Sequence, residues 1–392
     1  MNPEKLWSRT FIVLMGVNFC SALSFYLVMV EITEFTIDTY GVSHGMAGLM
    51  VSVYVIAALV TRLLFGSRID SWGVKRALVI GTGVNVICMG LYLVPMAFGL
   101  LMAVRIAHGF SFAIMSGSAA AGAALVIPRG RYGEGIGYFS MMQALATGVG
   151  PFVAILITSL SGSYSTMFTV ATVIAVLALA SLALLDIPRV EQQGSPVATR
   201  PDPRRTRRSL LQKSAIPLGV VLFLCYLGYS GILSFLTLYA EELELEKMAS
   251  LFFVVYAATI LLTRPPVGRR VDRKGENSII YWCFASLAVG FVVLALASNG
   301  AMLLASAALA GFGIGATQSI TQAVIARDTP PDELGRANST FFMSMDLGTG
   351  IGPLVIGGII PFIGYGGGYL VLAGAAAAAG VVYHLVHGRR AA

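Results

Sequence analysis

One sequence signature occurs twice in this chain, and the second copy lies 202 residues after the first. The signature reads Gly-x-x-x-Asp-x-x-Gly and follows a Thr-Arg pair in both copies. The related positions are Thr61 and Thr263, Arg62 and Arg264, Gly66 and Gly268, Asp70 and Asp272, Gly73 and Gly275, Gly148 and Gly350, Gly150 and Gly352, and Pro151 and Pro353. Because one offset relates all these positions, the chain is predicted to consist of two similar halves.

Most of the chain is too apolar to face water, since 57% of its residues are hydrophobic and only 11% are charged. A helix needs about 20 apolar residues to cross a bilayer. Such stretches run over 10–39, 46–65, 76–95, 98–127, 135–158, 165–186, 214–239, 248–266, 277–297, 301–326, 336–360 and 366–386. We therefore predict an all-α membrane protein with twelve transmembrane helices in two pseudo-symmetric six-helix bundles, residues 1–186 and 214–392.

The distribution of basic residues predicts the orientation in the membrane. The chain has 26 Lys and Arg residues against 19 Asp and Glu residues, and most basic residues fall at the termini and in alternate loops. Loops rich in Lys and Arg stay on the cytoplasmic side, so both termini and the basic linker 187–213 are expected there. The positive charge is therefore read as a topology signal, and no nucleic-acid partner is expected. The four cysteines lie in separate apolar stretches without metal-ligand spacing, so no metal site is expected either.

The repeated signature resembles the loop motif of the major facilitator superfamily, and the resemblance extends over the whole chain. It implies the major facilitator fold and transport by alternating access. In that family the Asp of each copy faces a helix start in the other half, which implies that Asp70 lies near 333–337 and Asp272 near 131–135. The residues that this resemblance assigns to a conformational gate are Arg62, Gly66, Asp70, Gly73, Arg76, Gly148, Pro151, Arg264, Gly268, Asp272, Gly275, Gly352 and Pro353.

Two further motifs narrow the resemblance. Arg105-Ile-Ala-His108-Gly109 is similar to the buried arginine motif of the family, with His108 where glutamine is usual. The segments that end in Pro151 and Pro353 resemble the antiporter motif, although a terminal glycine pair follows only Pro353. The chain thus resembles bacterial twelve-span exporters that exchange a drug or metabolite for protons. This resemblance implies a multi-pass protein of the bacterial cytoplasmic (inner) membrane.

Charged residues inside apolar spans are the candidates for substrate binding and proton coupling, because each costs about 2.5–3.5 kcal/mol at the membrane centre. Glu31 and Glu34 lie three residues apart, on one face of a helix, at a depth similar to that of Arg105. A proton or the substrate could therefore compete with Arg105 for either carboxylate. Asp346 lies near the middle of its span with no basic residue expected at that depth, and His108 is a candidate proton relay.

Each of these residues also has a plainer interpretation. Glu31 and Glu34 could be solvated charges at the outer mouth. Asp346 could belong to a polar cluster with Ser344 or Thr349, and His108 could simply pack and make one hydrogen bond.

A cavity between the halves is expected to be apolar and adaptable, because thioether and aromatic side chains suit variable amphipathic ligands. The candidate cavity residues are Asn18, Ser21, Phe25, Phe112, Met115, Met142, Gln143, Tyr226, Tyr229, Tyr256, Gln318, Gln322, Phe341 and Met345. The predicted function is proton-coupled export of a small amphipathic compound by a monomer in the lipid bilayer, with the proton gradient as energy source and no cofactor.

Two alternatives remain open at the level of sequence. One is uptake or facilitated diffusion of an organic anion, with Arg105 as the counter-charge and no proton exchange. The other is a membrane sensor or scaffold that does not transport. An enzyme is not expected, because none of the common catalytic motifs of intramembrane hydrolases is present.

Overall fold

The computed structural model describes residues 6–128, 131–185, 212–329 and 334–389, and side chains are not described at several positions, including 65–72 and 272. Within these residues all regular structure is helical. The helices are α1 (Arg9–Tyr40), α2 (His44–Trp72), α3 (Val74–Leu91), α4 (Phe98–Val126), α5 (Tyr132–Ser161), α6 (Tyr164–Ser181), α7 (Ile216–Glu242), α8 (Glu246–Lys274), α9 (Asn277–Ala295), α10 (Gly300–Arg327) and α11 (Leu334–Tyr383). Short helices η2 (Leu182–Leu184) and η4 (His384–Gly388) follow α6 and α11. Eleven of these helical segments, in the described part of the chain, are long and apolar enough to cross a membrane.

The predicted spans coincide with these helices, but two helices are longer than expected. The repeated signature was predicted to be a loop, and that prediction is wrong for most of its length. α2 continues to Trp72 and α8 continues to Lys274, so the turn begins only at the last glycine of each copy. Gly73 has φ +82° and Gly275 has φ +74°, a backbone conformation that residues with a Cβ rarely adopt. The two copies of the signature therefore end in the same kind of turn.

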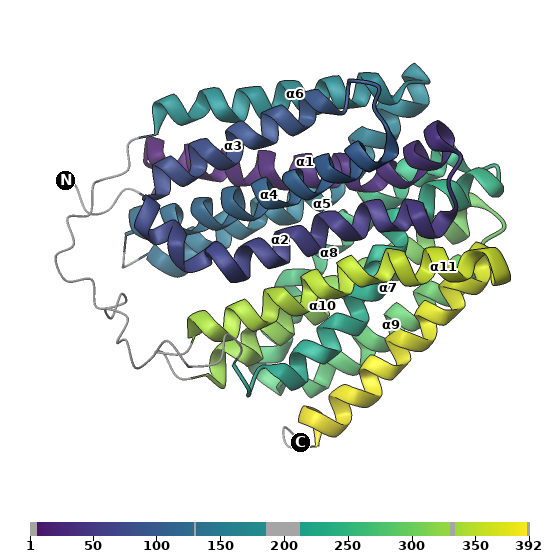
Figure 1. Cartoon of the computed structure of the whole chain (residues 1–392). Helices are drawn as coiled ribbons and strands as arrows, with labels where there is room; N and C mark the ends of the chain where they lie inside the picture. The colour runs from purple at the N-terminus through teal and green to yellow at the C-terminus, as the bar shows by residue number, and fades with distance from the viewer. Residues whose placement is uncertain (1–5, 129–130, 186–211, 330–333, 390–392) are drawn as a thin grey trace.

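The last helix, α11, changes direction in its middle. Gly364 has non-helical dihedral angles, with φ +70° and ψ 176°. The expected spans 336–360 and 366–386 lie on either side of it. Its repeat counterpart is Gly162, which has φ +62° and ends α5. In Figure 1 the chain turns back sharply beyond the α11 label and runs to the C-terminus.

The 202-residue offset is also visible in the packing of each half. A Cβ added to Gly109 would collide with the Tyr54 carbonyl oxygen, and one added to Gly311 would lie 2.6 Å from the Tyr256 carbonyl oxygen. Gly109 and Gly311 are 202 residues apart, as are Tyr54 and Tyr256. Close approach of helix backbones through glycine is typical of membrane helices. Figure 1 draws α1 to α6 mostly above α7 to α11, with the helices running in roughly the same direction.

The two halves meet along two equivalent helix pairs. α2 packs on α11, where a Cβ added to Gly350 would lie 3.3 Å from the Cβ of Val55. α5 packs on α8, where Gly148 faces Ala257. These contacts are repeat counterparts, since Val55 corresponds to Ala257 and Gly148 to Gly350. α1 also contacts α7. Below, the terminal end denotes the end of the bundle with residues 6–9 and 212–216, and the distal end denotes the end with the turns at 41–43 and 162–163.

Candidate functional site

An ion pair joins the two halves. Arg62 of α2 donates from an Nη atom to a carboxylate oxygen of Asp346 on α11 at 2.6 Å. The side chains are 27% and 21% exposed, so both remain partly accessible to water. The Arg62 guanidinium also lies 5.6 Å from the centre of the Phe112 ring, within the range of a cation–π contact. Any separation of α2 from α11 at this level has to break the ion pair.

This pair corrects the prediction that Asp346 has no basic residue at its depth. Arg62 lies ten residues before the end of α2, and Asp346 lies twelve residues after the start of α11. Arg62 was expected close to a membrane boundary, because the span predicted from sequence ended at residue 65. The expected partners of Asp346 are occupied elsewhere: Ser344 and Thr349 both donate to carbonyl oxygens of their own helix.

Arg105 is buried in the N-terminal half, with 1% of its surface exposed. Its Nε atom donates to the Met50 carbonyl oxygen at 2.8 Å, and its guanidinium lies 4.5 Å from the centre of the Tyr54 ring. One Nη atom lies 3.5 Å from the Tyr92 hydroxyl, and the other lies 4.0 Å from the Met29 sulfur. Arg105 therefore ties α4 to α1, α2 and the end of α3.

The structure does not bring Arg105 to Glu31 or Glu34. Arg105 reaches α1 at Met29, and successive residues of an α-helix are turned by about 100°, so Glu31 points to nearly the opposite side. Glu31 and Glu34 instead line a cleft of about 300 Å³ at the distal end, between the two halves. The cleft residues are Glu31, Glu34, Asp38, Ile155, Thr158, Ser159, Gly162, Ser163, Tyr164, Thr237, Glu241, Glu246 and Ala249.

Carboxylates dominate this distal cleft. Glu31 is 1% exposed, and its Oε2 atom has no hydrogen-bond partner. The Tyr164 hydroxyl lies 3.1 Å from a Glu34 oxygen and 2.7 Å from an Asp38 oxygen, although its single proton can serve only one of them at a time. Asp38 was missed from sequence, but its spacing of four residues from Glu34 places both on one helix face. Tyr164 and the residues of α7 reach the cleft only through the tertiary fold, so no local sequence pattern could have identified them.

His108 lies in the same buried cluster as Arg105. Its Nδ1 atom is 3.2 Å from the Tyr92 hydroxyl oxygen in a hydrogen bond, and its ring packs edge-on against Tyr54. These contacts are those of a packed histidine with one hydrogen bond. A chain of polar groups from His108 to Asp346 is not present in the described structure.

Aromatic residues of the predicted cavity form one cluster in each half. Phe25 stacks on Phe112 with ring centres 5.3 Å apart, and Tyr229 stacks on Tyr256 at 5.5 Å. Tyr226 packs edge-on against Tyr229. Tyr54 packs against Phe25 and Phe112, and its repeat counterpart Tyr256 belongs to the second cluster, so the two clusters occupy equivalent places.

The other predicted cavity residues differ in their contacts and in their exposure. Asn18 donates to the Phe139 carbonyl oxygen at 3.1 Å, and Gln318 lies 4.0 Å from the Met345 sulfur. The remaining residues divide by exposure. Ser21, Met115 and Phe341 are buried, Met142 is half-buried, and Gln143 and Gln322 are exposed.

The predicted gate is only partly described. The side chains of Gly66, Asp70 and Asp272 and the residues 330–333 lie outside the described part, so the expected contacts of Asp70 and Asp272 remain predictions. Arg76 is exposed and Gly268 has no close neighbour, whereas a Cβ on Gly352 would collide with Ser230. Pro151 and Pro353 both lie inside helices. Arg264 lies on α8 without an ion pair or hydrogen bond among the described residues, and its Nε atom is buried.

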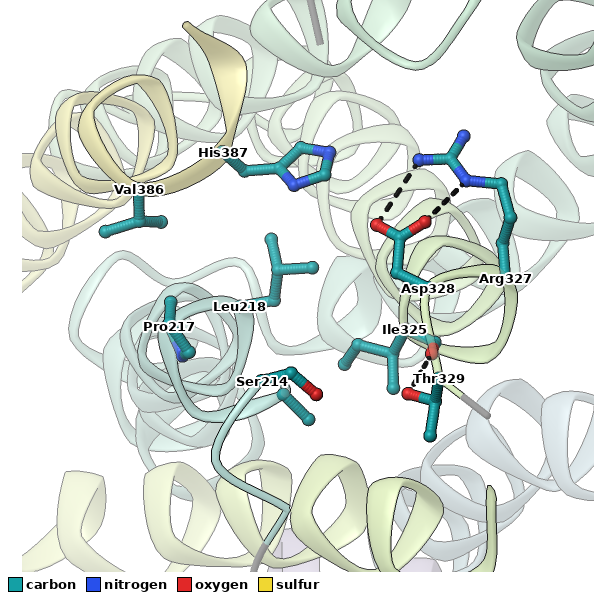
Figure 2. Close-up of a pocket in the computed structure, with 10 residues that line it drawn as sticks. Ser214, Pro217, Leu218, Ile325, Arg327, Asp328, Thr329, Val386 and His387 are labelled. Atoms are coloured by element: carbon teal, nitrogen blue, oxygen red, sulfur yellow. Dashed lines mark hydrogen bonds and ion pairs between the residues drawn. The ribbon is translucent and has the colours of Figure 1, made fainter. Parts of the chain in front are cut away.

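A second hollow, of about 410 Å³, lies at the terminal end of the second half (Figure 2). Its walls are the start of α7, the end of α10 and η4, and none of the predicted site residues lines it. Next to it, Arg327 donates two hydrogen bonds to Glu276, at 2.9 and 3.0 Å, and His387 lies 2.9 Å from the same carboxylate. Mainly because of the bonds from Arg327, the pKa of Glu276 is lowered to about 2. This cluster ties α9, α10 and η4 together.

No group of His, Cys, Asp and Glu side chains suited to a metal ion is present in the described residues. Two features between the halves carry charge in the described structure: the ion pair Arg62–Asp346 and the acidic distal cleft.

The chain is similar to known transport proteins along its length. The model of the Major Facilitator Superfamily matches residues 14–301 and 218–391. An uncharacterised MFS-type transporter of Methanocaldococcus jannaschii is 22% identical over 390 residues, covering 98% of this chain and 97% of the relative. A protein of Lactococcus lactis described as a multi-drug resistance efflux pump PmrA homolog is 26% identical over 384 residues, covering 93% and 92%. The crystal structure of the nucleoside transporter NupG is similar in fold, with a TM-score of 0.70 at 15% identity over 95% of this chain and 98% of that one.

Proposed function

Because the chain belongs to the major facilitator superfamily and is thus a membrane transporter and not an enzyme, we propose that it exports a small amphipathic compound in exchange for protons. The halves would rock about the two helix pairs α2–α11 and α5–α8, so that a central cavity opens alternately to each side. The proposed topology has twelve crossings, since Gly364 divides α11 where Gly162 separates α5 from α6. Both termini would face the cytoplasm of a bacterial cell.

The observation that carries the proposal is the Arg62–Asp346 ion pair. A proton on Asp346 would abolish the charge attraction, and this would favour separation of α2 from α11. Protonation would therefore be linked to the conformational equilibrium. The similarity to an efflux pump homologue supports the direction of transport.

The acidic distal cleft supports the same proposal from the other end. Glu31, Glu34 and Asp38 of one half line this cleft together with Glu241 and Glu246 of the other half. Like charges repel, so protonation of part of this cluster would favour closure. A proton taken up at the distal end would thus be linked to the closed distal conformation, as exchange with an outward-moving substrate requires.

The proposal is tested by flux of amphipathic dyes in proteoliposomes with an imposed pH gradient of either sign. Proton-coupled export predicts that dye accumulates against its own gradient, that the direction reverses with the pH gradient, and that a protonophore abolishes accumulation. Accumulation that never exceeds equilibrium under either gradient would contradict the proposal. Facilitated diffusion of an organic anion would then be the better interpretation.

A further inference from the structure

The acidic distal cleft lies in only one of the two equivalent interfaces. It is formed where α5 meets α8, and Glu246 at the start of α8 corresponds in the repeat to His44 at the start of α2. At the distal end of the α2–α11 interface, the His44 Nε2 atom and the Tyr365 hydroxyl oxygen are 2.8 Å apart in a hydrogen bond. A Cβ added to Gly357 would lie 2.5 Å from the His44 carbonyl oxygen. Direct contact thus closes one interface at this end, whereas the other has a cleft of about 300 Å³.

The carboxylates of the cleft are not repeated either. Those of α1 have buried apolar counterparts in α7, which are Leu233, Leu236 and Ala240. A scaffold that both halves share therefore does not need acidic side chains at these places. The difference between the halves indicates that the cleft serves a ligand rather than the fold.

The walls of the cleft offer acceptors without donors of matching charge. Five carboxylates line it, three from α1 and two from the second half, and none of its lining residues is Lys, Arg or His. Glu31 is 1% exposed, and its Oε2 atom has no hydrogen-bond partner. Across the cleft on α7, the buried Oγ1 atom of Thr237 also makes no hydrogen bond of normal geometry. Buried oxygens without a partner are costly, and a cationic donor in the cleft would offset this cost.

We propose that the distal cleft binds a linear polyamine, whose ammonium groups pair with carboxylates of both halves. An ammonium group has N–H donors and no acceptor, so it complements walls of carboxylate and hydroxyl oxygens. Several ammonium groups are needed because the carboxylates lie on opposite walls, with Glu31 and Glu34 on α1 and Glu241 on α7. The methylene chain between them would lie against Ile155 and Ala249, the apolar side chains of the lining. The volume is at the lower end of the range for small-molecule sites, which suits a thin chain.

A polyamine bound in this way would hold the two halves together at the distal end. It would add a bridge beside α5 and α8 to the hydrogen bond that already joins α2 and α11 there. It would also relieve the repulsion among the carboxylates, so it would favour conformations in which the distal ends of the halves are close. Under the proposed topology this end faces the outside of the cell, so the ligand would come from there. The inference concerns binding and does not rest on the direction of transport or on its coupling to protons.

The inference is tested by binding to the purified protein in nanodiscs of zwitterionic lipid, without a pH gradient. Spermidine and putrescine are compared with butylamine and with Mg²⁺, by titration calorimetry and by thermal shift. Spermidine is expected to bind about tenfold or more tightly than butylamine, the typical effect of an additional hydrogen bond between charged groups. If butylamine binds as tightly as spermidine, a single ammonium suffices and the inference is wrong. Equal binding of Mg²⁺ would contradict it too, because the cleft would then select charge and not the shape of a polyamine.

Variants on the two walls test the bridge between the halves. Glu31→Gln on α1 and Glu241→Gln on α7 should each weaken binding of spermidine about tenfold. Glu241 is exposed, so its variant is expected to fold even if the change at the buried Glu31 prevents folding. Glu242→Gln is the matched control, since Glu242 is an exposed neighbour that does not line the cleft, and it should bind spermidine as the wild type does. Equal binding by Glu241→Gln and Glu242→Gln would refute the bridge.

Discussion

Asp346→Asn removes one charge of the ion pair that joins the halves and keeps the size of the side chain. Two unit charges about 4 Å apart attract by about 4 kcal/mol at an effective dielectric constant of about 20. The guanidinium and the carboxylate are each about a quarter exposed, so their desolvation and screening offset part of this attraction. A net loss of about 2 kcal/mol would change the ratio of the two conformations by about 30-fold.

Under the proposed function, this change should separate two kinds of transport. An asparagine can still accept a hydrogen bond from Arg62, but it cannot exchange a proton. Asp346→Asn should therefore retain exchange of labelled substrate across proteoliposome membranes and lose accumulation driven by a pH gradient. The matched control is Asp328→Asn, which removes a carboxylate from an exposed pair with Arg327 outside the interface.

A charge swap distinguishes a proton site from a simple latch. Combining Arg62→Asp with Asp346→Arg restores an attractive pair between α2 and α11 but moves the carboxylate to the other half. If the pair acts only as a latch, the swap should restore accumulation driven by the pH gradient. If the Asp346→Asn variant accumulates substrate as well as the wild type does, Asp346 is a packing residue and the reasoning about proton coupling fails.

Three further predictions concern buried or paired charges. Arg105→Ala should abolish transport and lower the thermal stability of the purified protein. Arg105→Lys should not restore transport, because a point charge cannot reproduce the bond to the Met50 carbonyl oxygen together with the contact to the Tyr54 ring. Normal transport by the Lys variant would refute this role of Arg105. At least one of the variants Glu31→Gln and Glu34→Gln should remove the pH dependence of transport. If both variants keep the wild-type pH dependence, Glu31 and Glu34 are solvated charges at the outer mouth. The lowered pKa of Glu276 predicts stabilisation, of about 1 kcal/mol for a partly exposed pair, that is present above the ordinary pKa of Glu and is lost as the pH falls towards about 2. Melting curves of wild type and Glu276→Gln should therefore differ at pH 7 and converge in acid.

The positions of the helices followed well from sequence, because they depend on local composition. An apolar run of about 20 residues has few alternatives to a helix in a membrane. The ends of the helices were harder to predict. The signature of α2 contains Arg, Asp and two glycines, which look like a loop, yet its helix continues to Trp72.

The errors in the site followed from these ends and from side-chain direction. Ending α2 too early separated Arg62 from Asp346 in depth, although they form an ion pair. Arg105 was then paired with Glu31 because both were expected at the same depth in the membrane. In the structure Glu31 points away from the face of α1 that Arg105 contacts at Met29. Depth can be estimated from residue number, but direction also requires knowing which helices are neighbours. That information is contained in tertiary packing and not in the local sequence.

The repeat offers a way to separate structure from chemistry in this molecule. Positions with the same residue in both halves, such as Gly73 and Gly275, serve turns and close helix contacts. The charges inside the helix bundle follow a different pattern, since the counterparts of Asp346 and Arg105 are both alanine. Two halves that need the same scaffold retain the same packing residues, whereas under the proposed function one substrate and one proton path need their charges only once. Arg62 and Arg264 are the exception, being identical in sequence but unlike in pairing among the described residues, since Arg62 pairs with Asp346 and no described carboxylate pairs with Arg264.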